Sequence, residues 1–221
     1  ESRDNVAHDL RTPLMRLRNS IELVMANETA SVVELREALL DVAEEAEQIQ
    51  LLLTALMNQA EARVGTMRLN QELIDMNVLT QEVCELYELL AEEKQITLQK
   101  NFAEASVFLQ ADPVRLRQAL GNLLDNAIKF TPEGGLITVS IHSEPNVVII
   151  EIKDTGVGIS ESDQFRIFER LYRADKSRST KGIGLGLSLV QGIIQAHGAS
   201  IQVISAPNQG STFRIEFLHS I

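Results

Sequence analysis

A heptad seam in the first third of the chain constrains its fold more than any other feature. Apolar residues recur at alternating steps of four and three from Leu35 to Ala60, over nearly four repeats. This spacing puts one apolar stripe along a helix and favours packing against other helices. The same rhythm runs from Ala7 to Val24, and the capping-rich segment 27–31 separates the two runs. The sequence therefore predicts a helical hairpin.

The hairpin is expected to be half of a larger bundle. Two helices with wide apolar seams bury little surface alone, so a homodimer that forms a four-helix bundle is the simplest arrangement. The pattern changes after Val64-Gly65-Thr66. We therefore expect an all-α dimerisation domain of residues 1–65 and a second domain of residues 66–221.

The second domain mixes helix and strand signals. Its pattern is typical of an α+β sandwich with helices on one face of a mixed sheet. Asp112-Pro113 provides a helix N-cap followed by proline at the first helical position. Helices are predicted over 75–93, 113–129 and 187–196, and strands over 96–102, 107–110, 136–142, 147–153, 200–205 and 212–217.

Composition narrows the classes of partner. The 221 residues carry 20 Lys and Arg against 31 Asp and Glu, a net charge of −11. This balance argues against nucleic acid, because phosphate backbones need cationic side chains. The single cysteine, Cys84, excludes an internal disulfide, and no apolar run approaches the roughly 18 residues of a membrane helix. Because the chain begins with Glu1, we expect a fragment whose contact with a membrane is made only through missing upstream segments.

The first helix carries a candidate nucleophile. Ala7 and Leu10 belong to the apolar seam, so His8 and Asp9 between them are expected to point outward. Neutral imidazole can attack phosphorus through one nitrogen, while a neighbouring carboxylate accepts the proton from the other or orients the ring. Thr12 lies four residues on, on the same face as His8. A histidine on a helix surface is most often only solvated, so this pattern alone proves little.

Polar side chains on the helix after Asp112 form a candidate phosphate and metal site. Asn122, Asn126 and Lys129 lie on one stripe, while apolar residues cover the sides that would pack on the sheet. Amide oxygens are hard ligands suited to Mg²⁺, and the amine suits a triphosphate. An exposed polar face without a ligand is the alternative for this helix taken alone.

Two glycine-rich segments extend the candidate nucleotide site. Asp154 follows a predicted strand, where its carboxylate can accept a hydrogen bond from the adenine amine and would repel the keto oxygen of guanine. Gly156 and Gly158 let the backbone turn tightly beside a base. The glycines of 182–186 precede a helix, where free N–H groups bind anions. That segment has neither the Gly-Lys-Ser/Thr ending of a P-loop nor the spacing of a dinucleotide fingerprint.

Taken in order, these motifs resemble a known family. The string His8–Leu14 resembles the phosphoacceptor box of sensor histidine kinases. The second domain resembles the ATP-binding domain that these kinases share with Hsp90-type chaperones, type II topoisomerases and MutL-type repair ATPases, which implies the Bergerat (GHKL) fold. The resemblance implies His8 as phosphoacceptor, Asp9 as acid/base, and Thr12 as the residue that positions water in a phosphatase reaction.

The resemblance also implies roles on the nucleotide. Asn126 would hold Mg²⁺, and Asn122 and Lys129 would contact the phosphates. Asp154 would read adenine. The other nucleotide-binding positions that the family motifs imply are Phe130 (where a tyrosine is usual), Gly156, Gly158, Ile159, Phe168, Tyr172, Lys181, Gly182, Gly184, Leu185, Gly186 and Thr212.

The segment 160–181 resembles the lid over the nucleotide. Arg173 within it is the candidate that stabilises the γ-phosphate, since cationic side chains lower the cost of charge in phosphoryl transfer. Arg170 and Lys176 are alternatives for the same role.

The implied function is that of an ATP:protein-histidine phosphotransferase in a two-component system. The protein would phosphorylate its own His8 with ATP and Mg²⁺ and pass the phosphoryl group to an aspartate in the receiver domain of a response regulator. The fragment would be the cytoplasmic part of a bacterial inner-membrane sensor. Two alternatives stay open: an ATPase or serine kinase on the same fold, and a dimeric scaffold with a vestigial nucleotide site.

Overall fold

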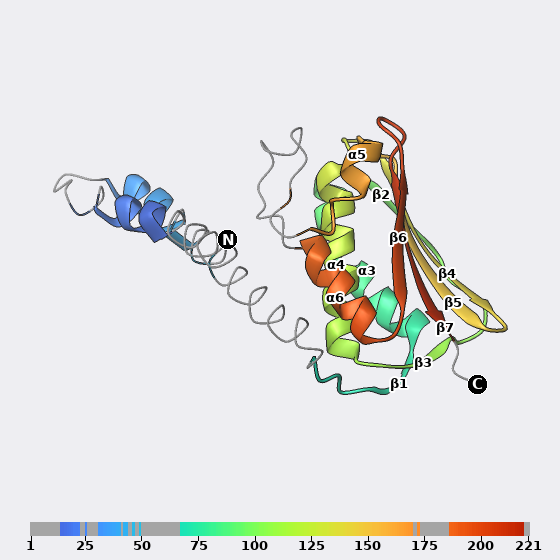
Figure 1. The fold of residues 1–221 in the computed structure, drawn as a ribbon. Helices are drawn as coiled ribbons and strands as arrows, with labels where there is room; N and C mark the ends of the chain where they lie inside the picture. The colour runs from blue at the N-terminus through green and yellow to red at the C-terminus, as the bar shows by residue number, and fades with distance from the viewer. Residues whose placement is uncertain are drawn as a thin grey trace. The chain divides into compact units, whose positions relative to one another are not determined.

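The chain forms two compact units, Glu1–Asn58 and Gln59–Ile221 (Figure 1). The structure is a computed structural model that describes residues 14–22, 25, 31–40, 42–43, 46, 49, 67–169, 172 and 186–218. Residues 50–66 lie outside this set, so the predicted domain limits of 1–65 and 66–221 stay a prediction. None of the helices in the described ranges is both long enough and apolar enough to cross a membrane.

The first unit is helical where it is described, over residues 14–22 and 32–40. Ser31 and Glu34 form a reciprocal capping box: the Ser31 N–H donates to the Glu34 carboxylate at 2.8 Å, and the Glu34 N–H donates to Ser31 Oγ at 3.3 Å. The predicted capping segment therefore does begin a helix. Leu35 and Leu39 of the predicted seam are exposed in the single chain.

The second unit combines helices with two sheets. Its elements are β1 (Glu72–Asp75), α3 (Met76–Glu93), β2 (Thr97–Asn101), β3 (Phe108–Ala111), α4 (Pro113–Phe130), β4 (Leu136–Glu144), β5 (Val147–Asp154), α5 (Glu161–Gln164), α6 (Gly186–Ala196), β6 (Ser200–Ser205) and β7 (Ser211–Leu218).

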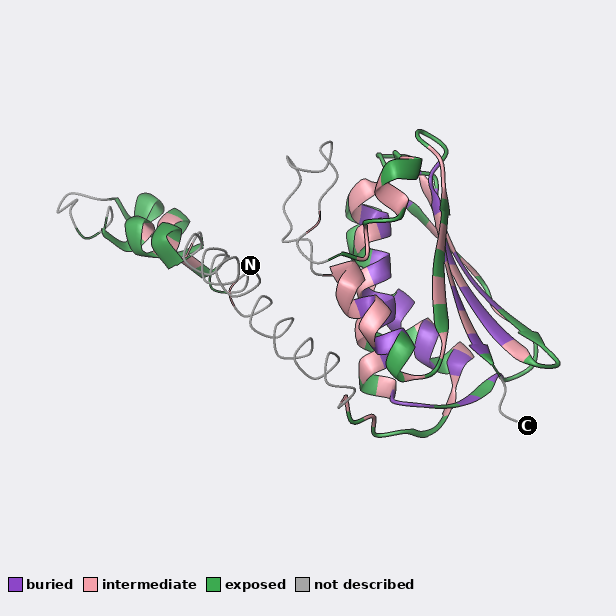
Figure 2. Ribbon diagram, in the orientation of Figure 1, coloured by how far each residue is buried: buried purple, intermediate pink, exposed green. Residues whose placement is uncertain are grey.

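The main sheet has five strands in the order β2-β4-β5-β7-β6. The pair β2–β4 is parallel and the other pairs are antiparallel, so the sheet is mixed. Helices α3, α4 and α6 cover one face, and the other face carries no helix in the described part of the unit (Figure 1). Figure 2 shows the buried residues where helices and sheet face each other. The predicted α+β sandwich with helices on one face is confirmed.

The helices start where their capping residues predict. The Asp75 carboxylate accepts from the Asn77 N–H at 2.9 Å and begins α3. The Asp112 carboxylate accepts from the N–H groups of Val114 and Arg115, both at 3.0 Å, and Pro113 begins α4. Alternate residues of the strands, such as Ile150 and Ile215, pack against these helices as one apolar core.

The ends of the predicted elements lie within two residues of the observed ones, and the strand predicted over 200–205 coincides with β6. Two short elements were not predicted. β1 pairs antiparallel with β3 in a separate two-stranded sheet, and α5 is a four-residue helix after the strand β5. The strand β3 has the same length and was predicted, but four residues are close to the limit at which a periodic pattern can be recognised.

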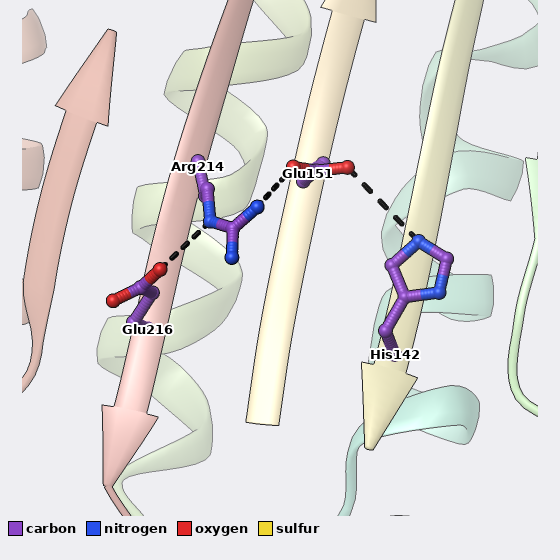
Figure 3. A network of polar contacts seen from close by, with 4 residues as sticks. All are labelled: His142, Glu151, Arg214 and Glu216. Atoms are coloured by element: carbon purple, nitrogen blue, oxygen red, sulfur yellow. Dashed lines mark hydrogen bonds and ion pairs between the residues drawn. The ribbon is translucent and has the colours of Figure 1, made fainter. Parts of the chain in front are cut away.

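The uncovered face of the sheet carries a network of polar side chains. Arg214 of β7 donates to Glu151 of β5 at 3.2 Å and to Glu216 at 2.7 Å (Figure 3). His142 of β4 lies 4.0 Å from the same Glu151. These side chains are partly exposed, so each ion pair contributes little to stability. The four side chains lie on the face of the main sheet that is opposite the helices.

Candidate functional site

Two amides of α4 meet the start of α6. Asn122 and Asn126 are half-buried, on a different side of α4 from its buried leucines. A Cβ built on Gly186, the first residue of α6, would lie 3.0 Å from Asn122 Oδ1 and 3.9 Å from Asn126 Nδ2. The Asn122 amide nitrogen donates to the Gln118 carbonyl at 2.8 Å, which leaves its oxygen on the side of Gly186. The helix stripe and the last glycine of the predicted anion site therefore lie together.

The C-terminal end of α4 is held by the side chain of Lys94. The ammonium of Lys94 donates to the carbonyls of Ile128 and Lys129 at 2.7 and 2.9 Å. A positive charge at a helix C-terminus satisfies carbonyls that have no helical donor and interacts favourably with the helix dipole. This contact holds the last turn, on which Lys129 and Phe130 are half-buried.

Asp154 is a buried carboxylate at the end of β5. It is only 5% exposed, and its Oδ1 accepts from the N–H groups of Gly156 at 2.7 Å and Ser211 at 3.2 Å. None of the described residues donates to Oδ2. Burial raises the pKa of this carboxyl, and the two N–H bonds offset the rise only in part, so its pKa lies above the usual value for Asp. A buried carboxylate of which one oxygen accepts from no described residue suits a ligand with an N–H donor.

The loop after Asp154 approaches other backbone so closely that side chains would not fit. A Cβ on Gly156 would lie 2.5 Å from the carbonyl oxygen of Phe130, at the end of α4. Gly158 has a φ of +66°, and a Cβ there would lie 1.9 Å from the Ala206 carbonyl oxygen. The predicted glycines therefore bring β5, the end of α4 and the β6–β7 turn to one place.

The segment that follows is anchored to the same turn. The Ile159 N–H donates to Ser205 Oγ at 2.8 Å, and the Gln164 amide donates to the carbonyls of Ile159 and Ser205 at 3.1 and 2.8 Å. Tyr172 donates from its hydroxyl to the Asp163 carboxylate. Phe168 packs partly buried against the core. The first residues of the predicted lid are therefore held by hydrogen bonds to the end of β6.

Most of the predicted site residues fall into two groups. The structure brings the ends of α4 and β5 together with the start of α6, and these elements carry the described residues Asn122, Asn126, Lys129, Phe130, Asp154, Gly156, Gly158, Ile159 and Gly186. Eight predicted residues lie outside the described ranges: His8, Asp9, Thr12, Arg173, Lys181, Gly182, Gly184 and Leu185.

Thr212 is a predicted nucleotide contact that does not face Asp154, and its contact with the nucleotide stays a prediction. Thr212 alternates with the buried Ser211 and Phe213 along β7 and lies on the same face as Arg214, away from the helices. Its neighbour Ser211, which is not among the predicted site residues, donates its N–H to Asp154. The two adjacent hydroxyl residues could be told apart only by the strand register, which the sequence does not specify.

Two family models match the chain. One, described as histidine kinase-, DNA gyrase B-, and HSP90-like ATPase, matches residues 111–220. The other, described as His Kinase A (phospho-acceptor) domain, matches residues 4–65. A curated relative, the adaptive-response sensory kinase SasA of Rippkaea orientalis, is 36% identical over 94% of this chain and 55% of its own length. The chain spans about half the length of such relatives.

Solved structures have the same fold. The histidine kinase AdeS of Acinetobacter baumannii aligns with a TM-score of 0.79 at 24% identity, over 97% of this chain and 98% of that one. The histidine kinase ThkA, in a complex with the response regulator protein TrrA, aligns with a TM-score of 0.76 at 23% identity, over 97% and 60% of the two chains. The two family models and the curated relatives define the class: the chain belongs to the histidine kinases, as a catalytic core with a GHKL-type ATP-binding domain.

Proposed function

We propose that the chain uses ATP to phosphorylate His8 and then transfers the phosphoryl group to an aspartate of a response regulator. His8 and its neighbour Asp9, the proposed acid/base, lie within the match to the phosphoacceptor family. The complex of ThkA with a response regulator supports a receiver domain as the partner. A phosphatase activity toward the regulator, with Thr12 positioning water, is proposed for the same helix.

The environment of Asp154 is the observation that carries the proposal. Its Oδ1 is held by two backbone donors, and Oδ2 accepts from none of the described residues. A carboxylate oxygen in this state accepts a hydrogen bond from the exocyclic amine of adenine. Guanine has a carbonyl oxygen in that position, and two acceptors facing each other in a buried place cost free energy. The site therefore selects ATP over GTP.

The phosphate side of the site is proposed on α4 and α6. The Asn126 amide oxygen fits Mg²⁺, which takes few protein ligands and keeps phosphate oxygens and water. When bound, Mg²⁺ neutralises charge that develops on the phosphate oxygens. Asn122 and Lys129 are proposed to contact the phosphates, and the N–H groups at the start of α6, from Gly186 on, favour an anion; the proximity of Gly186 to Asn122 supports this assignment.

The remaining assignments follow the family motifs. Arg173 is proposed to stabilise the γ-phosphate. The exposed Leu35 and Leu39 support a homodimer, because exposed apolar stripes on a helix are covered by partner helices. We propose that the whole protein is a bacterial inner-membrane sensor whose cytoplasmic part includes this core. The predicted nucleotide contacts at Lys181, Gly182, Gly184 and Leu185 remain proposals.

The proposal is tested by the chemistry of the phosphorylated residue. The purified chain is incubated with Mg²⁺ and ATP labelled at the γ-phosphate, and the protein-bound label is treated with acid and with base. Phosphohistidine is labile in acid and stable in base. We expect label of this kind in the wild type and in His142→Gln, and none in His8→Gln. His142 is a matched control because it is an exposed histidine on the uncovered face of the sheet.

Other outcomes identify the alternatives. Acid-stable label would indicate a serine kinase, and ATP hydrolysis without label would indicate an ATPase. Neither label nor hydrolysis would indicate a scaffold. Label that persists in His8→Gln would refute the assignment of the phosphoacceptor.

A further inference from the structure

The hydroxyl of Ser205 makes three hydrogen bonds at the junction of three segments. It donates to the Gly210 carbonyl at 2.7 Å and accepts from the Ile159 N–H at 2.8 Å. It lies 3.0 Å from the hydroxyl of Ser211, which must donate because the Ser205 proton is already used. A serine hydroxyl has one proton and two lone pairs. Ser205 therefore uses all of its hydrogen-bonding capacity at one point.

The position of Ser205 follows from the hairpin that β6 and β7 form. Ser205 is the last residue of β6 and pairs with Ser211, the first residue of β7. Directly paired residues in antiparallel strands put their side chains on the same face. The face is the one with Phe213, which packs against the helices. The two hydroxyls therefore lie on the side of the sheet that carries Asp154.

This cluster touches Asp154 through Ser211. The Ser211 N–H donates to Asp154 Oδ1, and the Ser211 side chain is hydrogen-bonded to Ser205. A Cβ on Gly210 would lie 1.9 Å from the Asp154 carbonyl oxygen, so the turn also rests against the backbone of Asp154. The orientation of the carboxylate is therefore determined in part by a hydroxyl that does not contact it.

The same hydroxyl holds the loop on the other side of the site. Ile159 begins the segment that leads into α5, and its N–H has Ser205 Oγ as acceptor. The Gln164 amide strengthens this junction by donating to the carbonyls of both residues. Loss of the hydroxyl would leave the Ile159 N–H and the Gly210 carbonyl without this partner. Both the loop 155–159 and the β6–β7 turn would then be held less firmly.

We propose that Ser205 is a positioning residue for adenine selection. It fixes the Ser211 N–H and the loop 155–159, so that Asp154 presents its second oxygen in one orientation to the base. The inference rests on the proposed function, because it requires that Asp154 reads adenine. Ser205 itself does not touch the nucleotide in this proposal, so its removal should affect base recognition more than phosphoryl transfer.

The test measures selectivity as well as affinity. Titrations of Mg-ATP and Mg-GTP into the full chain give two dissociation constants, and autophosphorylation at varied ATP gives KM and kcat. For Ser205→Ala we expect ATP to bind on the order of tenfold more weakly, the preference for ATP over GTP to shrink by a similar factor, and kcat at saturating ATP to stay within about twofold. Ser205→Thr keeps the hydroxyl and is expected to restore the preference in large part.

The control is Ser200→Ala, at the exposed start of the same strand. It should leave both dissociation constants unchanged. An unchanged ATP-to-GTP preference in folded Ser205→Ala, or an equal loss for both nucleotides, would overturn the inference. If Ser205→Ala does not fold, Ser211→Ala removes the hydroxyl partner instead and must reduce the preference in the same direction. Failure of the wild type to bind ATP would instead refute the proposed function.

Discussion

The imidazole of His197 accepts a hydrogen bond from the backbone N–H of Asp112, which lies 85 residues earlier in the chain. The distance from this N–H to Nε2 is 3.0 Å, and Nδ1 lies 2.8 Å from the Ile193 carbonyl oxygen. Nδ1 therefore carries the proton and donates, which leaves Nε2 free to accept. The ring thus ties the end of α6 to the N-cap of α4, and these two helices carry the proposed phosphate contacts.

His197→Ala should destabilise the protein by about 1–3 kcal/mol, because the buried N–H of Asp112 would lose its acceptor. The measurement is the free energy of unfolding of the full chain from urea denaturation. His142→Ala is the matched control: its side chain is 56% exposed and lies 4.0 Å from Glu151, so its effect should stay within about 0.5 kcal/mol. Equal effects of the two substitutions would contradict the prediction.

A comparison of Gly210→Ala with Gly134→Ala distinguishes the destabilisation caused by steric overlap from that caused by backbone strain. Both glycines have left-handed backbones, with φ of +76° and +77°. A Cβ at Gly134 meets nothing within 4 Å, whereas a Cβ at Gly210 would lie 1.9 Å from the Asp154 carbonyl oxygen. We expect a loss of about 1 kcal/mol for Gly134→Ala from backbone strain alone and about 3 kcal/mol for Gly210→Ala. Thermal or urea unfolding of both variants checks this, and similar losses would refute the close approach.

We expect the ionised carboxylate of Asp112 to stabilise the fold by an amount that depends on pH. Burial by itself raises the pKa of its carboxyl, but the N–H donors of Arg115, Asn70 and Val114 and the charge of Arg115 outweigh this, so the pKa lies below the usual value. A lowered pKa in the folded state means that the ionised group stabilises the fold above the unfolded pKa of about 3.9, and that this is lost as pH falls through the folded value.

Asp112→Asn should therefore cost about 1 kcal/mol at neutral pH, the difference between hydrogen bonds to a charged and to a neutral acceptor. The deficit relative to the wild type should shrink as pH falls below about 3.9, because the unfolded carboxyl then takes up a proton, and it should disappear once pH is also below the folded pKa. Urea unfolding of both proteins from pH 7 to pH 3 measures it. A deficit that stays constant over this range would show that the charge is not involved.

Much of the second unit could be predicted from the sequence, because its signals are local. Asp112-Pro113 predicted the start of α4, and the apolar spacing that follows predicted which side of this helix is buried. The long strands of the main sheet had apolar runs of sufficient length. Each of these features depends on residues a few positions apart, and such patterns follow directly from helix and strand geometry.

The contacts that complete the site could not be predicted, because they join distant segments. Ser211 donates to Asp154 across 57 residues and Ile159 donates to Ser205 across 46. Whether Ser211 or Thr212 faces the site depends on the register of β7, and a shift of one residue exchanges the two faces. Long-range pairing of this kind follows from the tertiary fold and leaves no signal in a short stretch of sequence.

Asp154→Asn is expected to have opposite effects on stability and on nucleotide binding. Burial raises the pKa of the Asp154 carboxyl, and the N–H groups of Gly156 and Ser211 offset this only in part. A raised pKa in the folded state means that the ionised carboxylate opposes folding at neutral pH and no longer does so once pH falls below both pKa values. Asn is neutral at every pH, and its oxygen can still accept from both N–H groups.

Without nucleotide, Asp154→Asn should therefore be more stable than the wild type at pH 7, with a difference that narrows as pH falls toward the usual pKa of Asp, about 3.9. With saturating Mg-ATP the order should reverse, because only the wild type gains the full stabilisation by bound ligand, and we expect the variant to bind ATP at least ~10-fold more weakly. Thermal unfolding of both proteins with and without Mg-ATP measures this.

Asp125→Asn, at an exposed carboxylate of α4, is the control and should change neither the stability nor the affinity for ATP. The prediction is contradicted if Asp154→Asn is less stable than the wild type without nucleotide at pH 7. The carboxylate would then have to accept from a donor other than Gly156 and Ser211. In that case the proposed hydrogen bond between Asp154 and the adenine amine would be refuted.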